Sequence, residues 1–155
     1  MFLHASPNLY KDFLGEKKEG ATVPPPLDFK QEAKTIKAAL KDPELSVCFK
    51  SKVATKENFT QMLQNVPKVL HISCHGIRNE PHTMRLNFDE VREEGHLLLF
   101  ENSYGAGELV SAKQLRLIMN SAKHDFDVVF VAACDSEDIG RIFQRCGAKH
   151  VVCVE

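Results

Sequence analysis

Two residues suited to nucleophilic chemistry, a histidine and a cysteine, each come directly after a short apolar segment. His75 follows residues 69–74 and is itself followed by Gly76, whereas Cys134 follows residues 128–133. Both segments are rich in β-branched residues, which predicts buried strands. The carboxyl ends of parallel strands share one edge of an open sheet, so neighbouring strands would bring the imidazole and the thiol together. A histidine beside a cysteine can generate a thiolate nucleophile.

This arrangement predicts hydrolysis of a peptide bond. An imidazolium at His75 and the start of a following helix both favour the thiolate form of Cys134. The thiolate would attack the carbonyl, and His75 would protonate the leaving amine. Gly76 has no side chain, so a developing oxyanion can approach its backbone N–H. The backbone N–H of Cys134 is the second candidate donor to this oxyanion. We interpret Asp135 and Ser136 as helix caps. Taken alone, His75 is best explained as a loop histidine and Cys134 as a core thiol. The prediction of an active site therefore depends on the two residues occurring together.

Metal and cofactor sites are not expected. His71 and His75 should point to one face of their strand and Cys74 to the other, and no second close pair of ligands completes a zinc site. Gly105 and Gly107 lack the third glycine of a dinucleotide-binding loop, so a turn is the better interpretation.

Size and composition are those of one globular domain covering residues 1–155. The net charge of −1, with both signs scattered, argues against nucleic acid as a partner. No segment approaches the ~20 apolar residues of a membrane span, and no secretory signal is visible, so no membrane partner is expected.

Five cysteines, an odd number, indicate reduced thiols in the cytoplasm. Apart from Cys134, they are interpreted as small buried hydrophobes: Cys48, Cys74, Cys146 and Cys153.

Strands and helices alternate along the chain, which predicts a three-layer α/β/α sandwich with a mainly parallel sheet. Predicted strands cover residues 1–5, 45–49, 69–75, 84–88, 96–100, 128–133 and 151–154. Predicted helices begin after Asp28, Thr55, Ser111 and either Asp135 or Ser136, and residues 77–83 form a polar loop at the site. The first helix carries a predicted buried stripe: Phe29, Ala33, Ile36 and Leu40. The sequence begins and ends at predicted strands. We therefore expect a C-terminally truncated domain that is a fragment of a longer protein.

The ordered set of segments resembles one known family. The matching segments are residues 69–76, 97–102, 107–115, 128–134 and 146–152, and the upstream helix with Glu32 fits the same layout. Together they resemble the CHAT domain, a caspase-like (clan CD) cysteine peptidase family related to separases, gingipains and caspases. The resemblance implies a caspase-like fold, a Cys-His dyad in active members, and TPR-type domains as partners elsewhere in the full-length chain. Those roles fall on Cys134 and His75, with Gly76 as oxyanion donor.

Two departures from the family pattern limit what the resemblance implies. The chain stops at Glu155, before the later strands that usually contribute to the substrate cleft. Relatives that cut after Arg or Lys carry an acidic residue two positions before the cysteine, where this sequence has Ala132.

Three functions therefore remain open, and whether the chain is an enzyme is undecided. The first is a caspase-like cysteine endopeptidase that cleaves protein or peptide substrates. The alternative is a catalytically inactive CHAT interaction or scaffold module of a larger signalling protein. The weakest is a redox-responsive protein in which Cys74 and Cys134 pair.

Overall fold

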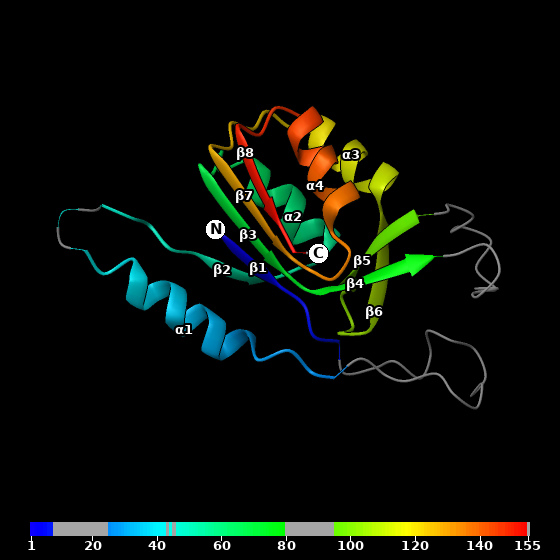
Figure 1. Cartoon of the computed structure of the whole chain (residues 1–155), viewed down its shortest axis with the longest axis horizontal. Coiled ribbons are helices and arrows are strands. Elements are labelled where there is room, and N and C mark those ends of the chain that lie inside the picture. The colour runs from blue at the N-terminus through cyan, green and yellow to red at the C-terminus, as the bar shows by residue number, and fades with distance from the viewer. Residues whose placement is uncertain (8–24, 43, 45, 80–94, 155) are drawn as a thin grey trace.

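The computed structural model describes residues 1–7, 25–42, 44, 46–79 and 95–154. These residues form a five-stranded sheet and a three-stranded sheet, flanked by helices (Figure 1). In chain order the elements are β1 (Phe2–His4), α1 (Phe29–Ala39), β2 (Ser51–Val53), α2 (Lys56–Leu63), β3 (Val69–Ser73), β4 (His75–Asn79), β5 (Gly95–Glu101), β6 (Gly107–Ser111), α3 (Ala112–Asn120), β7 (Val128–Ala132), α4 (Glu137–Arg145) and β8 (His150–Cys153).

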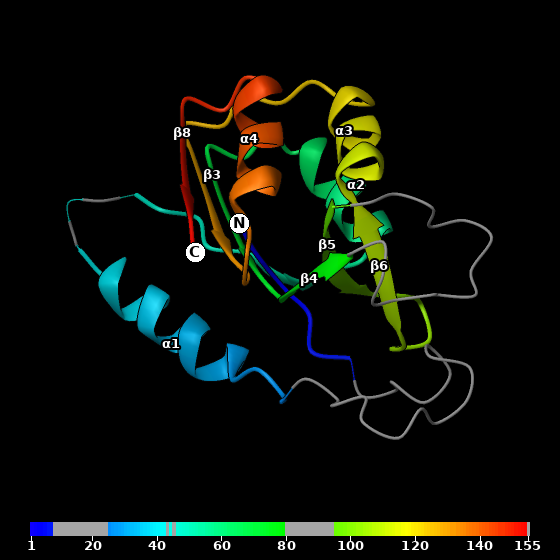
Figure 2. The same ribbon diagram turned by 45° about the vertical axis from the view of Figure 1, so that its right-hand side comes forward.

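The large sheet is parallel throughout and has the strand order β2-β1-β3-β7-β8. Helix α1 lies on one face of this sheet, and α2, α3 and α4 lie on the other (Figures 1 and 2). The predicted three-layer α/β/α sandwich with a mainly parallel sheet is therefore confirmed. The small sheet has the order β4-β5-β6, is antiparallel, and stands at the carboxyl end of β3.

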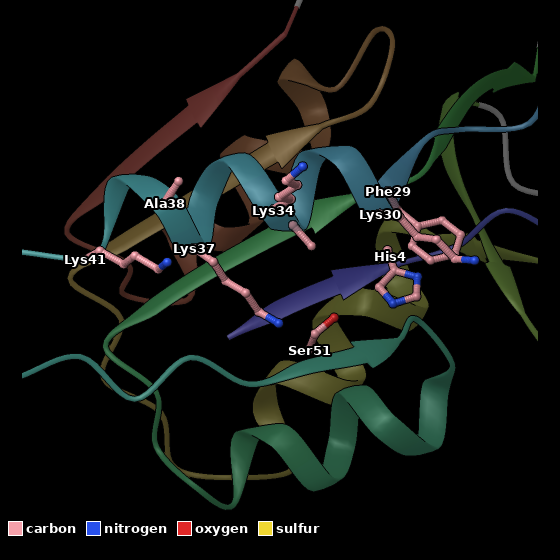
Figure 3. Close-up of a pocket in the computed structure, with 9 residues that line it drawn as sticks. His4, Phe29, Lys30, Lys34, Lys37, Ala38, Lys41 and Ser51 are labelled. Atoms are coloured by element: carbon pink, nitrogen blue, oxygen red, sulfur yellow. The ribbon is translucent and has the colours of Figure 1, made fainter.

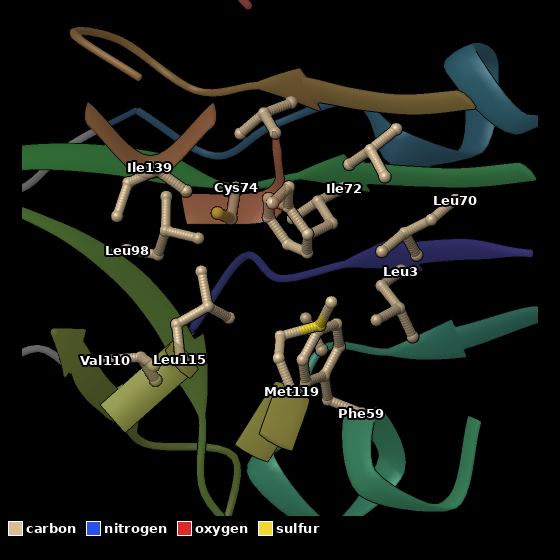
Figure 4. Packing of buried hydrophobic residues seen from close by; sticks show 14 of the residues in the cluster. Leu3, Phe59, Leu70, Ile72, Cys74, Leu98, Val110, Leu115, Met119 and Ile139 are labelled. Atoms are coloured by element: carbon tan, nitrogen blue, oxygen red, sulfur yellow. The ribbon is translucent and has the colours of Figure 1, made fainter. Parts of the chain in front are cut away.

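The hydrophobic core lies between the sheet and helices α2, α3 and α4 (Figure 4). Alternate residues of β3, Leu70 and Ile72, are buried there beside Val129 and Val131 of β7. Phe59 of α2 packs edge-on against Phe143 of α4, with the ring centroids 6.3 Å apart. Each such large side chain contributes about 1.5–3 kcal/mol through burial, so this face supplies most of the stability.

Helix α1 packs much more loosely on the opposite face. None of its residues is buried, and the four residues of the predicted stripe are only half-buried, so the predicted burial was wrong. The reason is that, within the residues described, α1 is the single helix on this face. No neighbouring helix among these residues encloses its apolar side. Its aromatic contact is Phe29, which stacks on His4 of β1 with ring centroids 4.0 Å apart.

Several predicted elements differ from the observed ones. The second strand lies at Ser51–Val53 and not at residues 45–49, because Phe2 and its neighbours pair with that later segment. Residues 77–79, predicted as loop, belong to β4, and β6 was not predicted at all. Cys48, predicted to be buried, is exposed outside any strand. The predicted strand at residues 84–88 lies outside the described residues.

All four predicted helix starts are confirmed, with the N-caps at Asp28, Thr55, Ser111 and Ser136. The side chains of Asp28, Thr55 and Ser111 each accept a hydrogen bond from the backbone N–H three residues later. At Ser111 the reciprocal bond from Gln114 completes a capping box.

No helix in the described ranges has the length and apolar character needed to cross a bilayer.

Candidate active site

The carboxyl ends of β3 and β7 lie level with each other. The two strands are parallel neighbours, with Ser73 paired to Ala132 in the last register position. One residue further on, the N–H of Cys74 still donates to the carbonyl of Ala132 at 3.3 Å. His75 and Cys134 each come two residues after that last pair. The prediction that β3 and β7 are neighbours is therefore confirmed, and both residues lie at the same edge of the sheet.

Gly76 brings the two chain segments into direct backbone contact. A Cβ atom built on Gly76 would lie 1.9 Å from the carbonyl oxygen of Cys134 and 3.1 Å from its nitrogen. These distances are shorter than van der Waals contact, and the atoms belong to the backbone, so they cannot move aside easily. The residue after His75 must be glycine for the two strand ends to approach this closely.

The two cysteines near the site differ completely in accessibility. Cys134 is exposed, whereas Cys74 is buried with 2% of its surface accessible. Burial raises the pKa of the Cys74 thiol to about 12, and a backbone hydrogen bond from Leu99 offsets only part of that effect. Cys74 therefore stays protonated and unreactive at neutral pH. It fits the prediction of a small buried hydrophobe and does not favour the redox pairing with Cys134.

His75 is held by a backbone carbonyl from a distant part of the chain. Its ring Nε2 lies 3.0 Å from the carbonyl oxygen of Pro25. A carbonyl oxygen only accepts hydrogen bonds, so Nε2 carries a proton and donates it to Pro25. In the neutral ring the lone pair is then on Nδ1, which leaves that nitrogen to exchange a proton with a reacting group. Sequence reasoning missed Pro25, because a backbone acceptor gives no side-chain signal.

The segment that carries Pro25 is fixed by two further backbone contacts. The N–H of Leu27 donates to Ser6 Oγ at 3.1 Å. The N–H of Ser6 in turn donates to a carboxylate oxygen of Glu101 at 2.9 Å. These bonds connect the segment just before α1 to the end of β5, a strand of the small sheet that begins with His75.

Glu32 anchors α1 to the strand that leads to His75. One of its carboxylate oxygens accepts a hydrogen bond from Ser73 Oγ at 2.6 Å, and the other lies 2.8 Å from His71 Nε2. His71 also stacks on Phe130 of β7, with ring centroids 4.7 Å apart. The predicted separation of His71 from Cys74 across the strand is confirmed, because Glu32 and α1 lie on the face opposite the core.

The turn after Cys134 leads directly into α4. Asp135 has a left-handed backbone conformation with φ of 50°, and Ser136 occupies the N-cap position. The predicted side-chain cap is wrong, because Ser136 Oγ lies instead 3.1 Å from the carbonyl oxygen of Val154 and 3.2 Å from that of Val131. Ser136 thus joins the turn to β7 and to the residue after β8. The N-terminus of α4 is left close to Cys134, where its N–H groups favour negative charge.

The small antiparallel sheet is linked to α4 by an ionisable pair. His96 Nδ1 of β5 lies 2.8 Å from a carboxylate oxygen of Asp138 in the first turn of α4. This contact lies between the sheet that begins with His75 and the helix that follows Cys134, but its geometry is not that of a hydrogen bond. Over the described ranges, no group of three His, Cys, Asp or Glu side chains could hold a metal ion.

Comparison with known proteins assigns the family. None of the curated proteins compared with the chain matches it significantly. The family model of the CHAT domain matches residues 5–154, which is nearly the whole chain, in agreement with the three-layer fold. The chain therefore belongs to the CHAT domain family, a group of caspase-like domains related to the clan CD peptidases.

Proposed function

We propose that this chain is a caspase-like cysteine endopeptidase in which Cys134 is the nucleophile and His75 the general acid and base. The observation that carries the proposal is the backbone contact between Gly76 and Cys134 at the level ends of β3 and β7. Membership of the CHAT family supports the reaction class, since active caspase-like enzymes use this pair of residue types. The exposure of Cys134 supports access by a substrate.

The proposed reaction proceeds through an acyl-enzyme. The Cys134 thiolate attacks the carbonyl carbon of the peptide bond and forms a C–S bond, while the carbonyl oxygen becomes an oxyanion. His75 has taken the thiol proton of Cys134 on Nδ1, and it gives this proton to the amine, which leaves as the C–N bond breaks. Water then attacks the thioester, His75 takes up a proton from it, and the thiolate is released with a carboxylate product. Throughout these steps the bond from Nε2 to Pro25 keeps the ring oriented.

The proposed oxyanion hole consists of the backbone N–H groups of Gly76 and Cys134. The close approach of Gly76 to Cys134 supports this assignment, because it brings the two backbone segments that carry these N–H groups together. Backbone donors of this kind stabilise the oxyanion without rearrangement during the reaction. Ala132 is uncharged, so the proposal includes no preference for Arg or Lys at the cleaved bond.

Cleavage of a peptide library by the full chain, read by mass spectrometry, tests the proposal. The variants are Cys134→Ala and His75→Ala, and Cys48→Ala is the control, since Cys48 is the other exposed cysteine. We expect the first two to lose at least ~10³-fold in kcat/KM and the control to lose less than about twofold. Turnover by Cys134→Ala equal to that of the wild type would contradict the proposal. Absence of cleavage by the wild-type chain would leave the interaction-module function in its place.

A further inference from the structure

An open groove separates α1 from the edge of the large sheet (Figure 3). It has a volume of about 530 Å³, which is in the range of small-molecule sites. One side is α1, and the other is formed by β1 and the edge strand β2. The groove exists because α1 touches the sheet mainly through Phe29 and Glu32 and buries none of its residues.

Three lysines of α1 and a fourth just after its C-terminus line this groove and make it strongly basic: Lys30, Lys34, Lys37 and Lys41. None of the four forms an ion pair with any residue that the structure describes, and no acidic residue is among the described residues that line the groove. Figure 3 shows the side chain of Lys37 extending from α1 toward Ser51 on β2. The same ammonium group lies 5.1 Å from the centre of the Phe49 ring, an arrangement that holds it over the groove.

The spacing of these lysines is unfavourable for an isolated helix. Within α1, Lys30 and Lys34 are four residues apart and Lys34 and Lys37 are three apart, and like charges at these spacings repel and destabilise a helix. Few apolar contacts on α1 offset this repulsion. A bound anion would relieve it, because its charge would balance the four ammonium groups.

An imidazole ring lies on the β1 side of the groove. His4 lines the groove beside Phe29, and its Nδ1 is buried with no hydrogen-bond partner among the described residues. Ser51 adds a hydroxyl on the opposite side. The groove therefore combines charge, hydrogen-bonding capacity and an aromatic ring within one concave site.

We infer that the groove between α1 and β1–β2 binds a small anion that carries several phosphate groups. Each phosphate monoester carries about −1.5 to −2 charges at pH 7, so two or three such groups balance four lysines within a site of this volume. Lysine suits phosphate as a compact point charge, whereas planar carboxylates are recognised best by the two-pronged arginine side chain. This inference does not depend on the proposed peptidase activity, and its test measures binding alone.

Titration calorimetry of the full chain with sodium tripolyphosphate, in about 150 mM salt, tests the inference. The binding variant is Lys34→Gln with Lys37→Gln, the two central lysines of the groove. The control is Lys113→Gln with Lys123→Gln, which removes the same charge on the far side of the sheet, at α3 and just after it. We expect the groove variant to lose at least about tenfold in affinity and the control less than about twofold. Circular dichroism checks that both variants remain folded, as expected for exposed helix positions.

Three outcomes would overturn the inference: no binding by the wild-type chain, equal losses in the two variants, or tighter binding of hexaglutamate than of tripolyphosphate. A competition arm distinguishes two sources of the phosphates. Displacement of tripolyphosphate by phosphoinositide-containing vesicles would identify a lipid headgroup as the ligand. Binding that such vesicles do not affect would identify a free phosphorylated molecule.

Discussion

The two faces of the large sheet are held by different kinds of interaction. On one face, α2, α3 and α4 enclose a continuous apolar core that includes Phe59 and Phe143. On the other, α1 buries no residue and is held mainly by the polar contacts of Glu32 and the stacking of Phe29 on His4. The first face determines stability. The second face carries the groups that orient His75.

This difference follows from the physics of the two interactions. Burial of apolar surface stabilises the fold strongly but has no preferred direction. It therefore makes the strands pack, but it does not determine the direction in which a ring nitrogen points. A hydrogen bond such as that from His75 to Pro25 adds little net stability but depends strongly on direction. Changes on the packed face should therefore alter folding, and changes on the α1 face should alter the site.

The largest difference is expected from matched isoleucine truncations. Ile139 of α4 is 1% exposed, whereas Ile36 of α1 is half-buried. We expect Ile139→Ala to lower the free energy of unfolding by about 2–5 kcal/mol, because it opens a cavity in the core. Ile36→Ala should cost less than about 1 kcal/mol. Urea denaturation of both variants measures the two values, and equal losses would show that the faces do not differ as described.

Gly76→Ala should have the next largest effect, since its methyl group would overlap the carbonyl of Cys134. We expect a loss of about 1–3 kcal/mol in the free energy of unfolding, together with separation of the two strand ends. Gly107→Ala is the matched control, because the atoms nearest to a Cβ there belong to side chains and not to the backbone: Leu99 Cδ1 at 3.0 Å and Pro7 Cγ at 3.6 Å. Urea denaturation again gives the comparison. A Gly76→Ala variant as stable as Gly107→Ala would refute the close backbone contact.

Glu32→Gln should affect the α1 face selectively. The amide is uncharged and accepts hydrogen bonds at only one of the two positions, so at least one of the contacts with Ser73 and His71 is weakened. We expect a loss of about 1–2 kcal/mol in stability and faster hydrogen exchange in residues 28–40. Glu57→Gln, on the exposed first turn of α2, is the control and should change neither. Unchanged exchange in α1 after Glu32→Gln would mean that Glu32 is not its anchor.

The smallest effect is a dependence on pH that belongs to the packed face. Burial raises the folded-state pKa of Cys74 to about 12, so the folded protein retains a proton there that the unfolded chain releases near its ordinary value. The protonated thiol makes its full contribution to the free energy of unfolding below about pH 9. This contribution falls as the pH rises further, and at pH 10 it is smaller by about 1 kcal/mol. Denaturation at pH 8 and pH 10 should show a smaller loss for Cys74→Ala than for the wild type. Cys48→Ala, which alters an exposed thiol, should behave as the wild type does.

Much of the packed face could be predicted from the sequence. The apolar segments at residues 69–74 and 128–133 predicted β3 and β7, because a buried parallel strand needs continuous apolar residues. Local capping at Thr55 and Ser111 predicted the starts of α2 and α3, since those hydrogen bonds involve residues three apart. The position of His75 and Cys134 at one edge of the sheet followed from the topology of parallel strands.

The small sheet and the contacts of α1 could not be predicted in the same way. β4 contains one large apolar residue, Ile77, and gains its strand conformation only by pairing with β5. The carbonyl of Pro25 reaches His75 from a distant part of the chain, and nothing in the residue type of Pro25 indicates that role. Residues 45–49 are more apolar than Ser51–Val53, which explains why the second strand was expected too early.

The most direct test of the account is the rate at which iodoacetamide alkylates Cys134 as a function of pH, measured by site-resolved mass spectrometry. Cys48 is an internal control, because it is exposed and lies outside any strand. If His75 activates Cys134, the alkylation of Cys134 will already be fast at pH 6, and His75→Ala will make it follow the slower profile of Cys48. If Cys134 and Cys48 share one profile in the wild-type chain, the histidine does not activate this thiol and the proposed peptidase site is wrong.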